Sequence, residues 1–93
     1  MKLHQKGFLL VHLNHAESLW DQEIIAATLK EYALEGTYWE NHIRVSLDEL
    51  AAGGLITRLE ERLIQENGKS ILNFRYQVSP FGKTRIVDAG LED

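Results

Sequence analysis

Two histidines stand at a spacing that could bind a metal ion. His12 and His15 are three residues apart, so on a helix their imidazoles would lie on one face, with Glu17 or Asp21 nearby. Histidines at such spacing are more commonly partly solvated structural residues. The chain also has no cysteine that could supply a thiolate ligand. We therefore expect no metal site and no cofactor.

Paired carboxylates are the other arrangement that could do catalytic chemistry. The adjacent pairs are Glu60-Glu61 and Asp48-Glu49. Neighbouring residues point to opposite faces of a strand and diverge by about 100° on a helix, so neither pair would converge on one substrate. The chain has no nucleophile-elbow serine, and its one glycine pair is expected to follow a helix rather than open one. An enzyme is therefore not expected.

Five polar or basic residues could instead contact nucleic acid. On a helix that enters the major groove, Arg44 could donate two hydrogen bonds to guanine O6 and N7, and Asn41 could contact adenine or a phosphate. His42 could contact a phosphate. Arg62 and Lys69 could reach backbone phosphates or the minor groove from a neighbouring loop. For each of them the alternative is an ordinary exposed polar or charged side chain.

The distribution of charge bears on these candidates more than the net charge of −4 does. Residues 1–55 contain four lysines and arginines against eight acids, residues 56–85 contain six against three, and residues 86–93 contain none against three. The segment charges are therefore −4, +3 and −3. A positive block coincides with the region that holds Arg62 and Lys69, which favours phosphate contacts there.

Length and hydropathy indicate one small soluble domain over residues 1–93. No apolar run approaches the roughly 20 residues that span a bilayer, and the longest, residues 7–11, is too short. Lys2 and Lys6 precede that run as in a signal peptide, but His12 interrupts it and no small-residue cleavage site follows. A cytoplasmic protein is expected.

Hydrophobic spacing and capping residues predict three helices in the first half of the chain. The first includes Gly7–Asn14 and starts somewhere after Met1, and the second begins at Ser18, where Ser-x-x-Asp resembles a capping box. The third begins at Thr37, where Thr-x-x-Glu is a second such pattern, or at Asn41, and it ends at Gly53-Gly54. The residues expected to be buried together in the core are Phe8, Ile24, Leu47 and Leu50.

The second half of the chain predicts a long β-hairpin. By propensity, residues 58–63 would also suit a helix, but Asn67-Gly68 is typical of a two-residue type I′ turn and the residues from Leu72 to Val78 alternate in polarity. This turn predicts the cross-strand pairs Leu63 with Leu72, Glu60 with Arg75, Leu59 with Tyr76, and Thr57 with Val78. Pro80 then suits the first turn of a final helix.

Two short motifs carry a resemblance to a known class of proteins. Leu47-Asp-Glu-Leu50-Ala-Ala-Gly-Gly54-Leu55-Ile56 and Tyr76-Gln-Val-Ser79-Pro-Phe-Gly82 resemble the end of the recognition helix and the segment after the wing in winged helix-turn-helix regulators of the MarR and PadR types. The resemblance covers roughly the whole chain in the order of its elements. It implies an α+β fold with three helices, a two-stranded antiparallel wing and a C-terminal helix. It also implies a homodimeric transcriptional regulator that binds double-stranded DNA.

A second function stays open beside that one. A winged-helix domain can bind protein rather than DNA, and the acids Asp48 and Glu49 on the third helix favour this alternative. The two hypotheses make different demands on the surface. A continuous positive surface from Arg44 to Lys69 would favour DNA, whereas an apolar or negative face on the third helix would favour protein.

Overall fold

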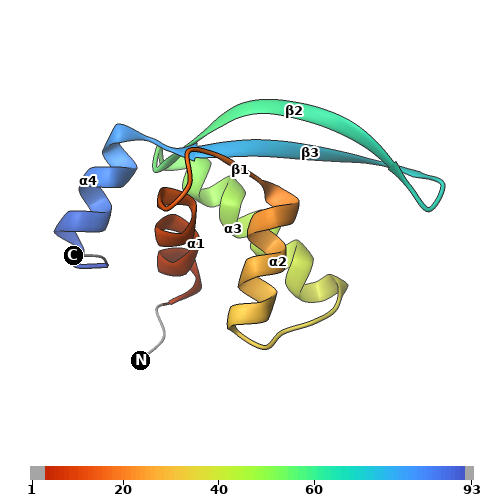
Figure 1. The fold of residues 1–93 in the computed structure, drawn as a ribbon, viewed down its shortest axis with the longest axis horizontal. Helices are drawn as coiled ribbons and strands as arrows, with labels where there is room; N and C mark the ends of the chain where they lie inside the picture. Colours follow the sequence, from red (N-terminus) through yellow and green to blue (C-terminus); the bar gives the residue numbers. More distant parts are fainter. Residues whose placement is uncertain (1–3, 92–93) are drawn as a thin grey trace.

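Within residues 4–91 the chain forms four helices and a three-stranded antiparallel sheet, with strand order β1-β3-β2 (Figure 1). A computed structural model describes residues 4–91. The elements in chain order are α1 (Gln5–Asn14), β1 (Leu19–Trp20), α2 (Asp21–Glu31), α3 (Thr37–Ala52), β2 (Ile56–Glu66), β3 (Lys69–Val78) and α4 (Pro80–Asp88). The expected α+β class is confirmed.

The core lies where α1, α2 and α3 pack together beneath one end of the sheet (Figure 1). Ile43, Leu47 and Leu50 recur at helical spacing on α3, and all three are buried, as is Ile24 of α2. Phe8 is the exception among the expected core residues, because it is only half-buried and its ring stacks on His12 at 5.5 Å between ring centroids.

The start of α2 differs from the sequence prediction. The helix begins at Asp21 rather than at Ser18, because Leu19 and Trp20 are used to form β1. The capping contact is made by Glu23, whose carboxylate accepts the backbone N–H of Trp20 at 3.0 Å. The hydroxyl of Ser18 instead accepts a hydrogen bond from Arg75 at 2.6 Å. Helix α3 begins at Thr37, the first of the two starts considered.

The sheet has one strand more than the two-stranded wing that was expected. In β1, Leu19 pairs with Tyr76 and Trp20 pairs with Arg75. Leu19 packs against the hydrophobic core, so the side chain of Trp20 points to the opposite face of the sheet. A strand of two residues is too short to produce an alternation that could be recognised in the sequence.

The β2–β3 hairpin has the predicted turn. Asn67 and Gly68 have positive φ angles of 52° and 76°, as a type I′ turn requires. Leu63 pairs with Leu72 and Glu60 pairs with Arg75, as expected. The hairpin extends well beyond the helices, so its tip projects away from the body of the protein (Figure 1).

The register changes near the base of the hairpin, where two of the predicted pairs are wrong. A bulge at Leu59 shifts β2 by one residue, so Arg58 rather than Leu59 lies opposite Tyr76, and Thr57 lies opposite Gln77 rather than Val78. The shift places Ile56 opposite Val78, and both are buried in the core. Burial of Ile56 therefore accounts for the bulge, because an unshifted register would turn this side chain away from the helices.

Helix α3 should lose its packing when Leu50 is truncated. Leu50→Ala is expected to reduce the free energy of unfolding by about 2–5 kcal/mol, because a buried leucine leaves a cavity that the helices cannot fill. Urea unfolding followed by circular dichroism measures this loss. Leu63→Ala is the matched control, because Leu63 is 64% exposed. Equal losses for the two variants would contradict the described core.

Candidate interaction surface of helix α3 and the hairpin

Asp21 connects helix α2, helix α3 and strand β3. Its buried carboxylate accepts the N–H of Gln22 at 2.8 Å, the N–H of Phe74 at 3.2 Å and a guanidinium N–H of Arg44 at 2.7 Å. The carboxylate therefore bonds the N–H of Phe74, the residue of β3 that directly precedes the two that pair with β1. It also links α2 to α3 through Arg44. Arg44, the expected base reader, is held in this ion pair, and its side chain is only 33% exposed.

Arg58 makes a second set of contacts between α3 and the hairpin. Its guanidinium donates to Asp48 at 3.0 Å and to the hydroxyl of Tyr76 at 3.2 Å, and it lies 3.8 Å from the ring centroid of Phe74. Burial raises the pKa of the Tyr76 phenol, and the hydrogen bond from Arg58 opposes the rise. Sequence reasoning did not single out Arg58, because only the bulge at Leu59 turns it toward α3.

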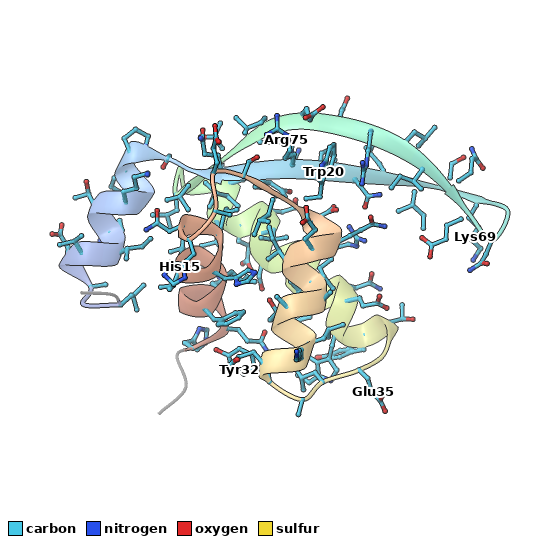
Figure 2. All side chains as sticks on the ribbon, in the orientation of Figure 1. His15, Trp20, Tyr32, Glu35, Lys69 and Arg75 are labelled. Carbon is cyan, nitrogen blue, oxygen red and sulfur yellow. The ribbon has the colours of Figure 1, made fainter. Side chains whose placement is uncertain are left out.

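The other candidate residues lie on different surfaces. Arg62 stacks on Trp20, with its guanidinium carbon 3.9 Å from the ring centroid, on the sheet face opposite to the one that carries Leu72 and Phe74. Lys69 lies at the exposed tip of the hairpin (Figure 2). Asn41 and His42 are exposed on α3, and the His42 ring lies 5.5 Å from that of Trp39. The five candidates therefore do not form one continuous basic surface.

Arg44 and Lys69 do line the same open hollow. It has a volume of about 530 Å³ and lies between α2, the first half of α3 and the hairpin tip. Acids line it as well, namely Glu40 of α3 and Glu66 of the hairpin. Its apolar wall includes Leu29 and Ile71, among other side chains. The charge along this hollow is thus mixed.

Large apolar side chains are exposed on α3 and on the adjoining hairpin. Tyr38 is 71% exposed and Val45 is 55% exposed, both on α3. Leu63 and Leu72 are 64% and 46% exposed. They pair across the hairpin on the face that also carries Phe74 and Tyr76. A hollow of about 100 Å³ between α3 and β3 is lined in part by Leu47, Leu72 and Phe74. We call Val45, Leu63 and Leu72 the apolar face.

The basic groups around α3 lie beside carboxylates. Lys6 is 3.2 Å from Glu49, and Arg58 is 3.0 Å from Asp48. Together with the pair of Arg44 and Asp21, these contacts neutralise positive charge on both flanks of the helix. Arg44 and Arg58, the cations beside α3 on the hairpin side, are therefore both held in ion pairs.

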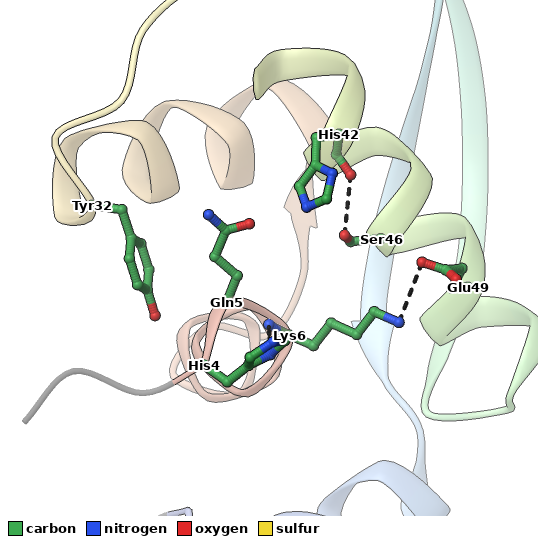
Figure 3. Close-up of a pocket in the computed structure, with 7 residues that line it drawn as sticks. All are labelled: His4, Gln5, Lys6, Tyr32, His42, Ser46 and Glu49. Carbon is green, nitrogen blue, oxygen red and sulfur yellow. Dashed lines mark hydrogen bonds and ion pairs between the residues drawn. The ribbon is translucent and has the colours of Figure 1, made fainter. Parts of the chain in front are cut away.

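A further hollow lies on the opposite flank of α3, between α1 and the end of α2 (Figure 3). It has a volume of about 520 Å³. The ion pair of Lys6 with Glu49 joins α1 to α3 across it, and the hydroxyl of Ser46 donates to the carbonyl of His42 within α3. The side chain of Gln5 points between α2 and α3. Among residues 4–91 no group of three histidine, cysteine or acidic side chains is placed to hold a metal ion.

Comparisons with known proteins found no matching family model, no matching curated protein and no matching solved structure. Over residues 4–91, none of the helices has the length and apolar character needed to cross a membrane.

Proposed function

We propose that this chain is a winged-helix module that binds a protein partner through the apolar face of α3 and the hairpin. The order helix, short strand, two helices and hairpin supports a winged-helix arrangement, in which α3 takes the place of the recognition helix. The three-stranded sheet and the projecting hairpin beside α3 are consistent with it. A winged-helix arrangement does not by itself choose between DNA and protein as the partner.

The chemistry of the exposed surface around α3 favours a protein partner over DNA. Val45, Leu63 and Leu72 leave large apolar side chains in water, which is the feature expected at the centre of a protein interface. A duplex instead requires cations that can replace the counterions of the phosphates. Arg44 and Arg58 are the cations nearest this face, and each is bound to a carboxylate.

The acids around the apolar face predict the charge of the partner's surface. The polar rim of the apolar face includes the acids Glu40, Asp48 and Glu61. A partner that presents apolar side chains flanked by lysine or arginine would complement this rim and bind faster at low salt. A second copy of the chain is one protein that can be tested directly, because a homodimer was also expected from the sequence.

Site-specific photocrosslinking tests this proposal. A photoreactive residue placed at Val45 or at Leu63 is expected to crosslink the same protein in cells, whereas one at Val87, 70% exposed on α4, is not. With that partner purified, Leu63→Glu should weaken binding at least about tenfold, because it buries an unpaired charge in the interface. Sedimentation equilibrium of the wild type shows whether the partner is a second copy. Crosslinks that are no more specific at Val45 and Leu63 than at Val87 would contradict the proposal.

Duplex DNA is the second candidate partner, favoured by Asn41 on the exposed side of α3 and by the shared hollow of Arg44 and Lys69. Under the protein-binding proposal, random duplex should bind weakly even at low salt, where the phosphate attraction is strongest. Tight binding would reverse the order of the two candidates. Lys69→Ala should then flatten the slope of log affinity against log salt by about one unit.

A further inference from the structure

The sheet face opposite to the one that carries Leu72 and Phe74 has an aromatic ring covered by an arginine. Trp20 comes from β1, on one side of β3, and Arg62 comes from β2, on the other side. Their side chains nevertheless meet, with the Arg62 guanidinium carbon 3.9 Å from the centroid of the Trp20 ring. To meet, they must lie across the strand between them (Figure 2 shows Trp20 at the hairpin).

Asn73 is the residue of β3 over which they meet. It pairs directly with Arg62, and it lies two residues from Arg75, the partner of Trp20, so all four side chains are on the same face. Asn73 is 0% exposed. Neither its amide nitrogen nor its amide oxygen has a hydrogen-bond partner.

A buried amide without a partner is unusual and unfavourable, because the group has lost its bonds to water and gained none in return. A leucine would fill a similar volume on this strand without that penalty. Asn73 therefore needs a reason other than packing. Its carboxamide offers a donor and an acceptor side by side, on the same sheet face as the ring of Trp20 and the guanidinium of Arg62.

We propose that this face binds a purine base, which takes the place of the Arg62 guanidinium on Trp20 and pairs with the amide of Asn73. Asparagine can form two hydrogen bonds with adenine, and an indole ring is a strong stacking surface for a base. Arg62 is exposed at the end of a flexible side chain, so it can leave the ring without any movement of the backbone.

The displaced Arg62 would bind the phosphate of the nucleotide in the complex. Once the base covers Trp20, the guanidinium of Arg62 is free to contact the phosphate of the same nucleotide. Arg75 would not compete for this role, because it is held by Glu60 at 2.5 Å and by Ser18 at 2.6 Å. The site therefore combines ring stacking, an amide pair and one mobile cation.

Tryptophan fluorescence tests the proposal in a Trp39→Phe background, where Trp20 is the remaining tryptophan. Adenosine monophosphate is expected to quench Trp20 saturably, whereas ribose 5-phosphate, which lacks the base, should not. Single-stranded oligodeoxyadenylate and the matching duplex distinguish the source of the base. Binding of the single strand alone assigns the site to unpaired bases, and binding of the mononucleotide alone assigns it to a free nucleotide. If neither adenosine monophosphate nor the single strand quenches Trp20 saturably, the proposal is overturned.

Two variants separate this site from a structural role of the same residues. Asn73→Leu should weaken nucleotide binding about tenfold through loss of the amide pair, without lowering the melting temperature. Arg62→Ala should abolish the preference for adenosine monophosphate over adenosine and leave adenosine binding equal or tighter. Arg85→Ala on α4 is the control for lost charge. If Asn73→Leu fails to fold, Arg62→Ala still decides, because equal preference in wild type and variant contradicts the proposal.

The test is independent of the proposed function. Leu63→Glu changes the opposite face of the hairpin and should leave Trp20 quenching unchanged. A failure of nucleotide binding would therefore leave the protein-binding proposal intact, and the reverse also holds.

Discussion

Replacing Gly82 with alanine is expected to cost about 3 kcal/mol or more of unfolding free energy, at or beyond the upper end for overpacked cores. A Cβ at this position would lie 2.0 Å from the carbonyl oxygen of Leu55 and 2.8 Å from a methyl group of Val78. The carbonyl cannot easily move aside, because it accepts the N–H of Ser79 at 3.1 Å. Helix α4 should detach from the sheet, which chemical unfolding and loss of helical circular dichroism would report.

Gly53→Ala is the matched control for that experiment. The nearest atom to a Cβ at Gly53 is a backbone oxygen 3.5 Å away, an ordinary contact, and its φ of −81° suits any residue. This variant is expected to be neutral or to stabilise the protein by about 0.4–1 kcal/mol, because alanine has fewer conformations to lose on folding. If Gly82→Ala behaves as Gly53→Ala does, α4 does not pack on Leu55 as described.

Removing the carboxylate of Asp21 is the other change with a large expected effect. Asp21→Ala should lower the unfolding free energy by about 1–3 kcal/mol for each group that it leaves without a hydrogen-bond partner. The loss leaves the N–H of Phe74 without its acceptor and Arg44 without its counterion. Denaturant unfolding measures it, with Asp48→Ala as the control, because the exposed pair of Asp48 and Arg58 should contribute less than about 1 kcal/mol.

This result also determines how variants of Arg44 should be interpreted. Arg44→Ala removes the same ion pair, so weaker binding of any partner by that variant can arise from a displaced α3 rather than from a lost contact. A double-mutant cycle of Asp21 and Arg44 isolates their coupling. Additive losses for the two residues would show that the ion pair does not connect α2 and α3 energetically.

Short-range signals in the sequence were enough to predict much of the fold. Asn67-Gly68 predicts a hairpin because both residues tolerate positive φ, and the turn then determines which residues pair near it, as Leu63 with Leu72 shows. Helix α3 is predictable because its three buried apolar residues, Ile43, Leu47 and Leu50, recur at helical spacing. These signals involve residues close together in the chain, and their physical causes are local.

Tertiary contacts decided the rest. Strand β1 exists because β3 offers an open edge to Leu19 and Trp20, and the bulge at Leu59 exists because Ile56 must reach the core. The candidate site depends on the same kind of contact. Sequence alone showed Arg44 as an available cation, but Asp21, 23 positions earlier, binds it. Pairing between charges so far apart depends on how the helices pack, so only the folded structure reveals which cations remain unpaired for a partner.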